Sequence, residues 1–198
     1  MQPKLVLMYT IQLHHGRRIK LKPFSKIIAV FGSSAISQDS PDAEQAYIMG
    51  KLLAEAGFKI SNGGYCGAME SASRGAVEAG GKVVGVISQV FSHRVPNQYL
   101  TETVETADLL ERIETLMRIS DGYVVLDGGI GTLAELFIAW NMLATGWDKP
   151  VIVVGNRMKQ ALEDIRMHTE IEEKHLQLLH FCPTVEEAVK QLKKAFEQ

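Results

Sequence analysis

Short apolar runs and segments of helical spacing alternate along the chain from residue 26 onward. The run at residues 27–31 is continuously apolar, as expected for a strand buried on both faces of a sheet. Further apolar runs occur at residues 83–87, 122–126 and 151–154, and residues 58–60 are predicted to form a short strand. Helical patterns are found at residues 41–56, 67–79, 107–120, 133–144 and 158–168. This alternation predicts an α/β fold of the Rossmann-like, doubly wound class, with a mainly parallel sheet and helices on both faces.

Helix ends carry their own signals. Ser40 can cap a helix whose first residue is Pro41, and Gly57 can end it. Thr184 and Glu187 form a capping-box pattern, which predicts the start of the last helix. A short apolar stretch at residues 178–181 precedes that helix.

Two segments depart from the alternation. Residues 1–25 show strand-like alternation on both sides of His15 and Gly16, which predicts a β-hairpin extension to a single domain over residues 26–198. The basic side chains of this hairpin are interpreted as a solvated face, with a partner surface as the alternative. Residues 88–105 lack periodicity and are predicted to form a long loop, which would be uncommon unless it covers a site.

Composition narrows the functional classes. The formal net charge of −2 over 198 residues gives no basis for nucleic-acid binding through a basic surface. Neither a membrane-spanning apolar run nor a signal-peptide pattern is found, so a cytoplasmic protein without membrane contact is expected. Cys66 and Cys182 have no metal-type spacing, and no metal site is predicted.

The most informative stretch is the glycine-rich turn at residues 127–135, between a predicted strand and a predicted helix. Backbone N–H groups at such a turn converge on an anion, and the helix N-terminus adds partial positive charge. Ligands of parallel α/β sheets bind outside the carboxyl ends of the strands. The sequence therefore predicts phosphate binding by a group of turn residues: Gly128, Gly129, Ile130, Gly131 and Thr132, with Ser33 and Ser34 of an earlier turn.

Simpler interpretations of this stretch exist. The turn could merely join strand to helix, although it holds more glycine than a turn needs. Its Gly-x-Gly-x-x-Ala pattern matches a dinucleotide fingerprint, but the next strand ends without a carboxylate for a ribose, so no nicotinamide cofactor is expected. Glu135 lies in the first turn of the predicted helix. There it could serve chemistry on a bound sugar phosphate, or form a capping box with Thr132 as the N-cap.

Several motifs occur in a recognisable order. Residues 31–34 and 62–69 form two glycine-containing turns, Glu111 and Arg112 follow, and the late turn ends with Glu135. These motifs resemble those of the Lonely Guy family, the cytokinin-activating nucleoside 5′-monophosphate phosphoribohydrolases once mislabelled lysine decarboxylases. The resemblance covers roughly residues 26–156.

The resemblance implies hydrolysis of the N-glycosidic bond of a nucleoside 5′-monophosphate, with no metal or organic cofactor. Glu135 and Arg112 would be the catalytic residues, although Arg112 could also be an exposed arginine paired with a neighbouring glutamate. The base or ribose would contact Gly63, Gly64 and Met69, of which Met69 could instead be a core residue. A homodimer is also implied, in which the helices bearing Arg112 and following Glu135 lie near the interface. The second helix suits this role because it is rich in apolar residues: Leu136, Phe137, Trp140, Met142 and Leu143.

The chain departs from the family pattern at two positions. Asp127 replaces the proline that opens the signature, and Ile113 replaces the lysine after the arginine. A carboxylate at the rim of an anion site should weaken phosphate binding unless it is paired or directed away. These departures favour an alternative function, a carrier that binds a nucleotide or the molybdenum cofactor, a phosphorylated pterin, without turnover. A third hypothesis, a partner protein acting through the hairpin, leaves the glycine-rich turns without a role.

Overall fold

The computed structural model describes residues 9–12, 18–21 and 26–197, which form a two-stranded sheet and a seven-stranded sheet. The seven strands are all parallel, in the order β6-β5-β4-β3-β7-β8-β9. This confirms the predicted Rossmann-like fold class. The strands are β1 (Tyr9–Gln12), β2 (Arg18–Leu21), β3 (Ile27–Phe31), β4 (Lys59–Asn62), β5 (Val83–Ser88), β6 (Glu102–Thr106), β7 (Gly122–Val125), β8 (Val151–Val154) and β9 (His180–Cys182). The helices are α1 (Pro41–Glu55), α2 (Ala68–Glu78), the 3-10 helix η1 (Gln89–Phe91), α3 (Leu109–Ile119), α4 (Ile130–Ala144), α5 (Asn156–Met167), α6 (Glu173–Leu176) and α7 (Val185–Phe196).

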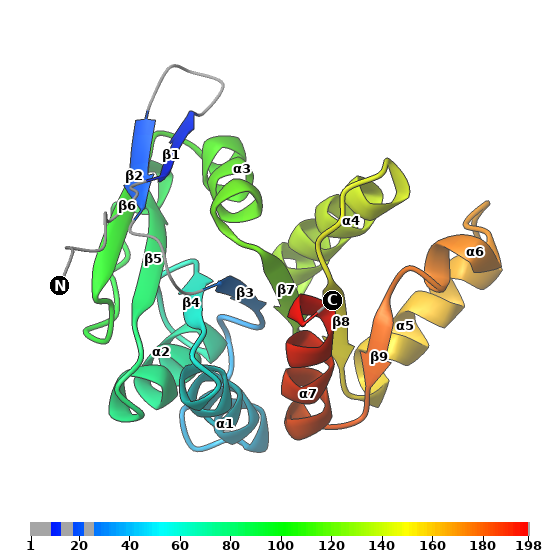
Figure 1. Cartoon of the computed structure of the whole chain (residues 1–198), viewed down its shortest axis with the longest axis horizontal. Helices are drawn as coiled ribbons and strands as arrows, with labels where there is room; N and C mark the ends of the chain where they lie inside the picture. Colours follow the sequence, from blue (N-terminus) through cyan, green and yellow to red (C-terminus); the bar gives the residue numbers. More distant parts are fainter. Residues whose placement is uncertain (1–8, 13–17, 22–25, 198) are drawn as a thin grey trace, which may run out of the picture.

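The central strand β3 divides the interior into two apolar cores. All of its side chains are buried, and successive side chains point to opposite faces of the sheet. Ile28 and Val30 belong to a core closed by α1, α2 and α7, whereas Ile27, Ala29 and Phe31 belong to a core closed by α3, α4 and α5. In Figure 1, α1, α2 and α7 lie along the lower side of the sheet, and α3 and α4 along its upper side. The continuous apolar character of β3 follows from this covering of both faces.

The two predicted helix caps are confirmed. The Ser40 hydroxyl accepts a hydrogen bond from the Ala43 N–H at 3.2 Å, with Pro41 as the first residue of α1. The Thr184 hydroxyl accepts from the Glu187 N–H at 3.3 Å at the start of α7. Each hydroxyl satisfies a backbone donor that the first turn of a helix leaves without an intrahelical partner.

Three elements differ from the prediction. Residues 88–105 are not one long loop, because they contain η1 and the edge strand β6. The short helix α6 has no counterpart in the predicted elements. Helix α4 begins at Ile130, three residues earlier than expected, so that part of the glycine-rich turn is its first turn. This last difference changes the geometry of the predicted site.

The predicted N-terminal hairpin is confirmed in part. Strands β1 and β2 pair antiparallel, with Tyr9 opposite Leu21 and Gln12 opposite Arg18. The turn expected at His15 and Gly16 lies outside the described residues, and the division into segments 1–25 and 26–198 stays a prediction. Within the part of the chain that the structure describes, no helix is long and apolar enough to cross a membrane.

The order of the strands creates a switch point between β3 and β7. From β3 the chain proceeds outward through β4, β5 and β6, and from β7 it proceeds in the opposite direction through β8 and β9. The turns at the carboxyl ends of these two neighbouring strands diverge, and ligands of open α/β sheets bind in the crevice between such turns. Ser33 follows β3 and Asp127 follows β7, so the two predicted anion-binding turns flank this crevice.

Candidate functional site

The turn after β7 presents free backbone donors. Gly129 is the N-cap of α4 and provides no side-chain cap. The N–H groups of residues 129–132 have no hydrogen-bond acceptor among the residues that the structure describes. Ile130 is 89% exposed, and a Cβ added at Gly129 or Gly131 would meet open space. An anion could therefore approach these amides without displacing a protein group.

Of the remaining residues of the predicted phosphate site, Gly128 and Ser33 contact the turn before α4, whereas Ser34 contacts the turn before α2. A Cβ on Gly128 would overlap the hydroxyl of Thr132, which is buried, so this turn requires glycine. The Ser33 N–H donates to the Asp127 carbonyl at 3.3 Å, which joins the turns after β3 and β7. The Ser34 carbonyl accepts from the Cys66 thiol at 3.4 Å. Ser33 thus links the turns after β3 and β7, and Ser34 contacts the turn before α2.

Glu135 does not form the capping box that the sequence allowed. Thr132 is the third residue of α4 rather than its N-cap, and Glu135 lies in the second turn. Its carboxylate points to the adjacent helix α3, where its Oε1 lies 3.8 Å from Nη1 of Arg112. The side chain of Glu135 is only 12% exposed. The interpretation of Glu135 as a helix cap is therefore wrong.

Arg112 is buried rather than an exposed helix arginine. Its Nε donates to the Val86 carbonyl at 2.9 Å. The guanidinium lies 5.8 Å from the ring centroids of both Tyr65 and Phe91, within the range of cation–π attraction. Sequence reasoning missed both rings. Phe91 gave no signal because it lies in the segment without periodicity.

The pair of Glu135 and Arg112 is electrostatically unusual. Burial raises the pKa of Glu135 from its usual 4.5 to about 7, although the positive charge of Arg112 opposes the increase. Burial likewise lowers the pKa of Arg112, while the charge of Glu135 partly restores it. A carboxyl group with a pKa near neutrality can both take up and release a proton, and strongly shifted groups of this kind concentrate at functional sites.

The turn after β4 lies against Arg112. Asn62 holds this turn, because its side-chain oxygen accepts from the Gly64 N–H at 2.8 Å. Gly63 must be glycine, since a Cβ there would overlap the Arg112 guanidinium and lie 2.7 Å from the Met69 sulfur. Met69 is buried at the start of α2. Gly63 and Met69 therefore border the buried arginine.

Asp127 is paired. Its Oδ2 accepts from Nε of Arg157 at 2.8 Å, and its Oδ1 accepts from the Met158 N–H at 3.0 Å. The carboxylate thus caps the N-terminus of α5. A cleft of about 360 Å³ adjoins this contact, and its lining includes Ser33, Gly128 and Leu133. No pattern in the sequence indicated the contact with Arg157.

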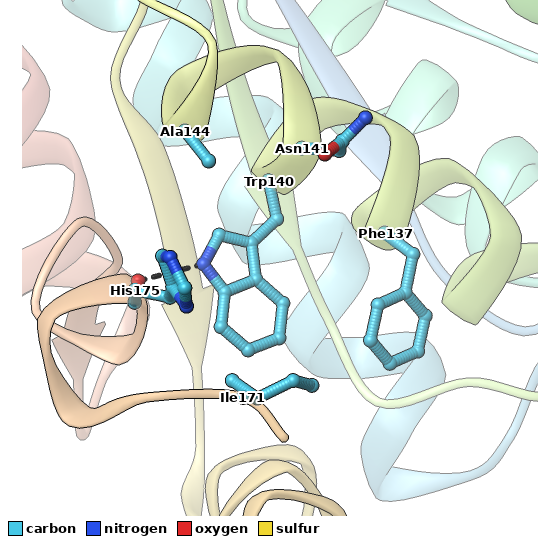
Figure 2. Close-up of a pocket in the computed structure, with 6 residues that line it drawn as sticks. All are labelled: Phe137, Trp140, Asn141, Ala144, Ile171 and His175. Carbon is cyan, nitrogen blue, oxygen red and sulfur yellow. Dashed lines mark hydrogen bonds between the residues drawn. The ribbon is translucent and has the colours of Figure 1, made fainter. Parts of the chain in front are cut away.

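A second cavity, of about 200 Å³, lies between α4 and the segment containing α6. Figure 2 shows Trp140 between Phe137 and His175, with its indole N–H donating to the His175 carbonyl at 2.7 Å. Ile171 lies below the indole ring (Figure 2). Leu136 and Trp140 are buried within the chain. The other apolar residues predicted for the interface, Phe137, Met142 and Leu143, are partly buried against the same core, so the surplus apolar surface is smaller than the sequence suggests.

Lys149 binds the C-terminal end of α3. Its ammonium group donates to the carbonyls of Met117 and Ser120, at 2.9 and 2.7 Å. These carbonyls lie at the C-terminal end of α3, where cations are favourable. The residue is half-buried, and burial lowers its pKa to about 8. It stabilises the helix that bears Arg112.

Comparison with known proteins places the chain in a family. The family model described as "Possible lysine decarboxylase" matches residues 69–192. A cytokinin riboside 5′-monophosphate phosphoribohydrolase of Mycobacterium tuberculosis is 35% identical over 114 residues, 56% of this chain and 61% of the relative. The match thus spans less than two thirds of that relative's length. The chain belongs to the Lonely Guy family.

Other proteins similar to this Lonely Guy chain cover more of it. A protein of the same name from Rhodococcoides fascians is 26% identical over 156 residues, 76% of this chain and 79% of the relative. The solved structure of a molybdenum cofactor binding protein from Rippkaea orientalis has a TM-score of 0.70 and 25% identity. That comparison covers 87% of this chain and 98% of the other. The similar proteins therefore include both enzymes and a cofactor-binding protein.

Proposed function

We propose that this Lonely Guy protein hydrolyses the N-glycosidic bond of a purine-type nucleoside 5′-monophosphate. The bond between C1′ of the ribose and the base nitrogen would break, and a bond between C1′ and the oxygen of water would form. One proton of the water would pass to the base, so that the products are the free base and ribose 5-phosphate. The transition state would resemble a ribosyl oxocarbenium ion, as in other glycoside cleavages.

One observation carries this proposal. A carboxyl group whose pKa is about 7 lies one turn beyond a helix N-terminus with free amides, and it is paired with a buried arginine. A phosphate bound at the free amides would bring its attached sugar next to the carboxyl group. The arrangement suits chemistry on the sugar of a phosphate ester, because the ionisable group lies beside the anion site rather than within it.

Each group would then have a defined role. The amides of Gly129, Ile130, Gly131 and Thr132 would anchor the 5′-phosphate. Glu135 would activate the water or stabilise the developing positive charge on the ribose, for which a pKa near the working pH is well matched. Arg112 would hold Glu135 in position and contact the leaving base.

The test is release of free base. Purified protein is incubated with AMP, and adenine and ribose 5-phosphate are quantified by chromatography. Turnover is expected, and Glu135→Gln should reduce it by at least ~10²-fold, the lower range for a general acid or base. Glu163→Gln, which changes a partly exposed carboxylate paired with Lys159, should retain full activity. Equal rates for wild type and Glu135→Gln would refute the catalytic role.

A second function, non-catalytic binding, is favoured by the similarity to the molybdenum cofactor binding protein of Rippkaea orientalis. The departure at Ile113, where the family has a lysine, is also consistent with it. A carrier would gain thermal stability with its phosphorylated ligand but release no base. Stabilisation by AMP without any adenine would therefore support the carrier and reject the hydrolase.

We further propose a homodimer formed through α3 and α4, as implied by the family resemblance. Leu110 is 75% exposed on α3 and Ile138 is 36% exposed on α4. Both border a mostly apolar hollow of about 230 Å³ between these helices. Exposed apolar residues grouped in this way are typical of interaction surfaces. Sedimentation of a monomer alone at micromolar concentration would reject the dimer.

A further inference from the structure

Asp127 occupies an unusual position for a negative charge. It directly precedes Gly128 in the turn that would bind the 5′-phosphate. The cleft beside the turn is lined by both Asp127 and Gly128, so the carboxylate and the proposed phosphate site border the same space. An unpaired carboxylate there would repel a phosphate group.

Arg157 compensates this charge. Its Nε lies 2.8 Å from Oδ2 of Asp127, and its Nη2 lies 2.7 Å from Oδ1 of Asp42. Asp42 lies in the first turn of α1, whereas Arg157 lies in the first turn of α5. The guanidinium thus joins two helix starts to the phosphate turn, and all three charged side chains line the cleft.

The orientation of Asp127 is also fixed. Its second oxygen accepts from the Met158 N–H at 3.0 Å, at the N-terminus of α5. The carboxylate therefore has partners on both oxygens: a guanidinium on one and a helix start on the other. Both contacts hold it against the first turn of α5.

We propose that Arg157 is a positioning residue for the phosphate site: it pairs with Asp127 and holds its carboxylate toward α5, so that a phosphate monoester can bind the adjacent turn. This inference rests on the proposed function. It makes affinity for the phosphate group depend more strongly on Arg157 when Asp127 carries a charge than when it does not. A contact that merely fastens α5 would stabilise the fold without this dependence.

A double-mutant cycle separates these roles. Binding of AMP is measured by calorimetry in Glu135→Gln protein, where turnover is suppressed, and Arg157→Gln and Asp127→Asn are added singly and together. Arg157→Gln should weaken AMP binding about 3- to 10-fold, a modest factor because Arg157 is 67% exposed and its field is screened by solvent. In the Asp127→Asn background the same change should have a smaller effect, because only the direct attraction of Arg157 and its pairing with Asp42 are then lost.

Two controls identify the phosphate as the affected group. Adenosine, which lacks the phosphate, should bind with the same affinity with or without Arg157. Arg157→Lys keeps a cation at the site and should retain most of the affinity for AMP. If Arg157→Gln does not fold, Arg157→Lys becomes the informative variant.

Each outcome is decisive. The key comparison is the loss of AMP affinity caused by Arg157→Gln in two backgrounds, with Asp127 intact and with Asp127→Asn. If the loss is the same in both, the proposed positioning role of Arg157 is overturned. An equal loss for adenosine and AMP would overturn it too. AMP binding that does not depend on Arg157 would overturn it as well, while leaving the proposed function intact. Failure of the protein to bind any nucleoside monophosphate would instead overturn the proposed function, and this inference with it.

Discussion

Replacing Glu135 with glutamine should stabilise the protein, and the gain should increase with pH. In the folded protein, burial raises the pKa of Glu135 from 4.5 to about 7. Between these two values the folded state binds more protons than the unfolded state, so stability falls as the pH rises. The neutral carboxyl group of Glu135 makes its full contribution to the free energy of unfolding below about pH 4.5. This contribution is lost as the pH rises through about 7. Glutamine keeps the neutral form at every pH.

The size of the effect follows from the pKa shift. A rise from 4.5 to about 7 corresponds to roughly 3 kcal/mol, at about 1.36 kcal/mol per pKa unit. This is an upper limit for the gain of Glu135→Gln, reached above about pH 8, because relaxation around the ionised carboxylate would reduce it. Near pH 4 the two proteins should be about equally stable, since Glu135 is then neutral in both states.

Urea unfolding of both proteins between about pH 4 and about pH 9 measures this difference. Glu163→Gln is a suitable control, because its partly exposed ion pair with Lys159 should contribute little at any pH in this range. A stability difference between wild type and Glu135→Gln that is independent of pH would refute the reasoning. So would a difference that favours wild type increasingly above neutrality.

Three further predictions concern other parts of the molecule. Gly63→Ala places a methyl group against the Arg112 guanidinium, so the rate of AMP hydrolysis should fall about 10²-fold while the circular dichroism spectrum stays unchanged. An unaltered rate would contradict the close packing of Gly63 against Arg112. Ser40→Ala removes the N-cap of α1 and should cost about 1 kcal/mol in urea unfolding, whereas Ser40→Asn should cost little; equal losses would argue against the cap. Leu110→Asp should convert the proposed dimer to monomer in sedimentation experiments, and an unchanged dimer would exclude this part of α3 from the interface.

Most of the central sheet was predictable because its strands are buried on both faces. The run at residues 27–31 has no polar residue, and burial of all five side chains explains why. Strand β6 was missed for the opposite reason. Its sequence, Glu-Thr-Val-Glu-Thr, has one apolar residue, Val104, because an edge strand can leave polar side chains in solvent.

The candidate site was predictable only where it is local in sequence. The glycine-rich turn was recognisable, but its glycines concealed that α4 already begins at Ile130, since glycine is a poor helix former. This misplaced start made Glu135 resemble part of a cap. The contacts of Arg112 with Phe91, and of Asp127 with Arg157, join distant elements, and no spacing within one segment could reveal them.

The two edges of the large sheet bear on the behaviour of this protein at high concentration. Unpaired strand edges invite association with other molecules, and natural proteins protect them with charges or by keeping them short. Strand β6 carries Glu102 and Glu105, and β9 spans only His180–Cys182. Replacing Glu102 and Glu105 with neutral residues would remove the charges from the β6 edge, whereas the short length of β9 would be unchanged. Edge-to-edge association of such a variant should therefore begin at β6.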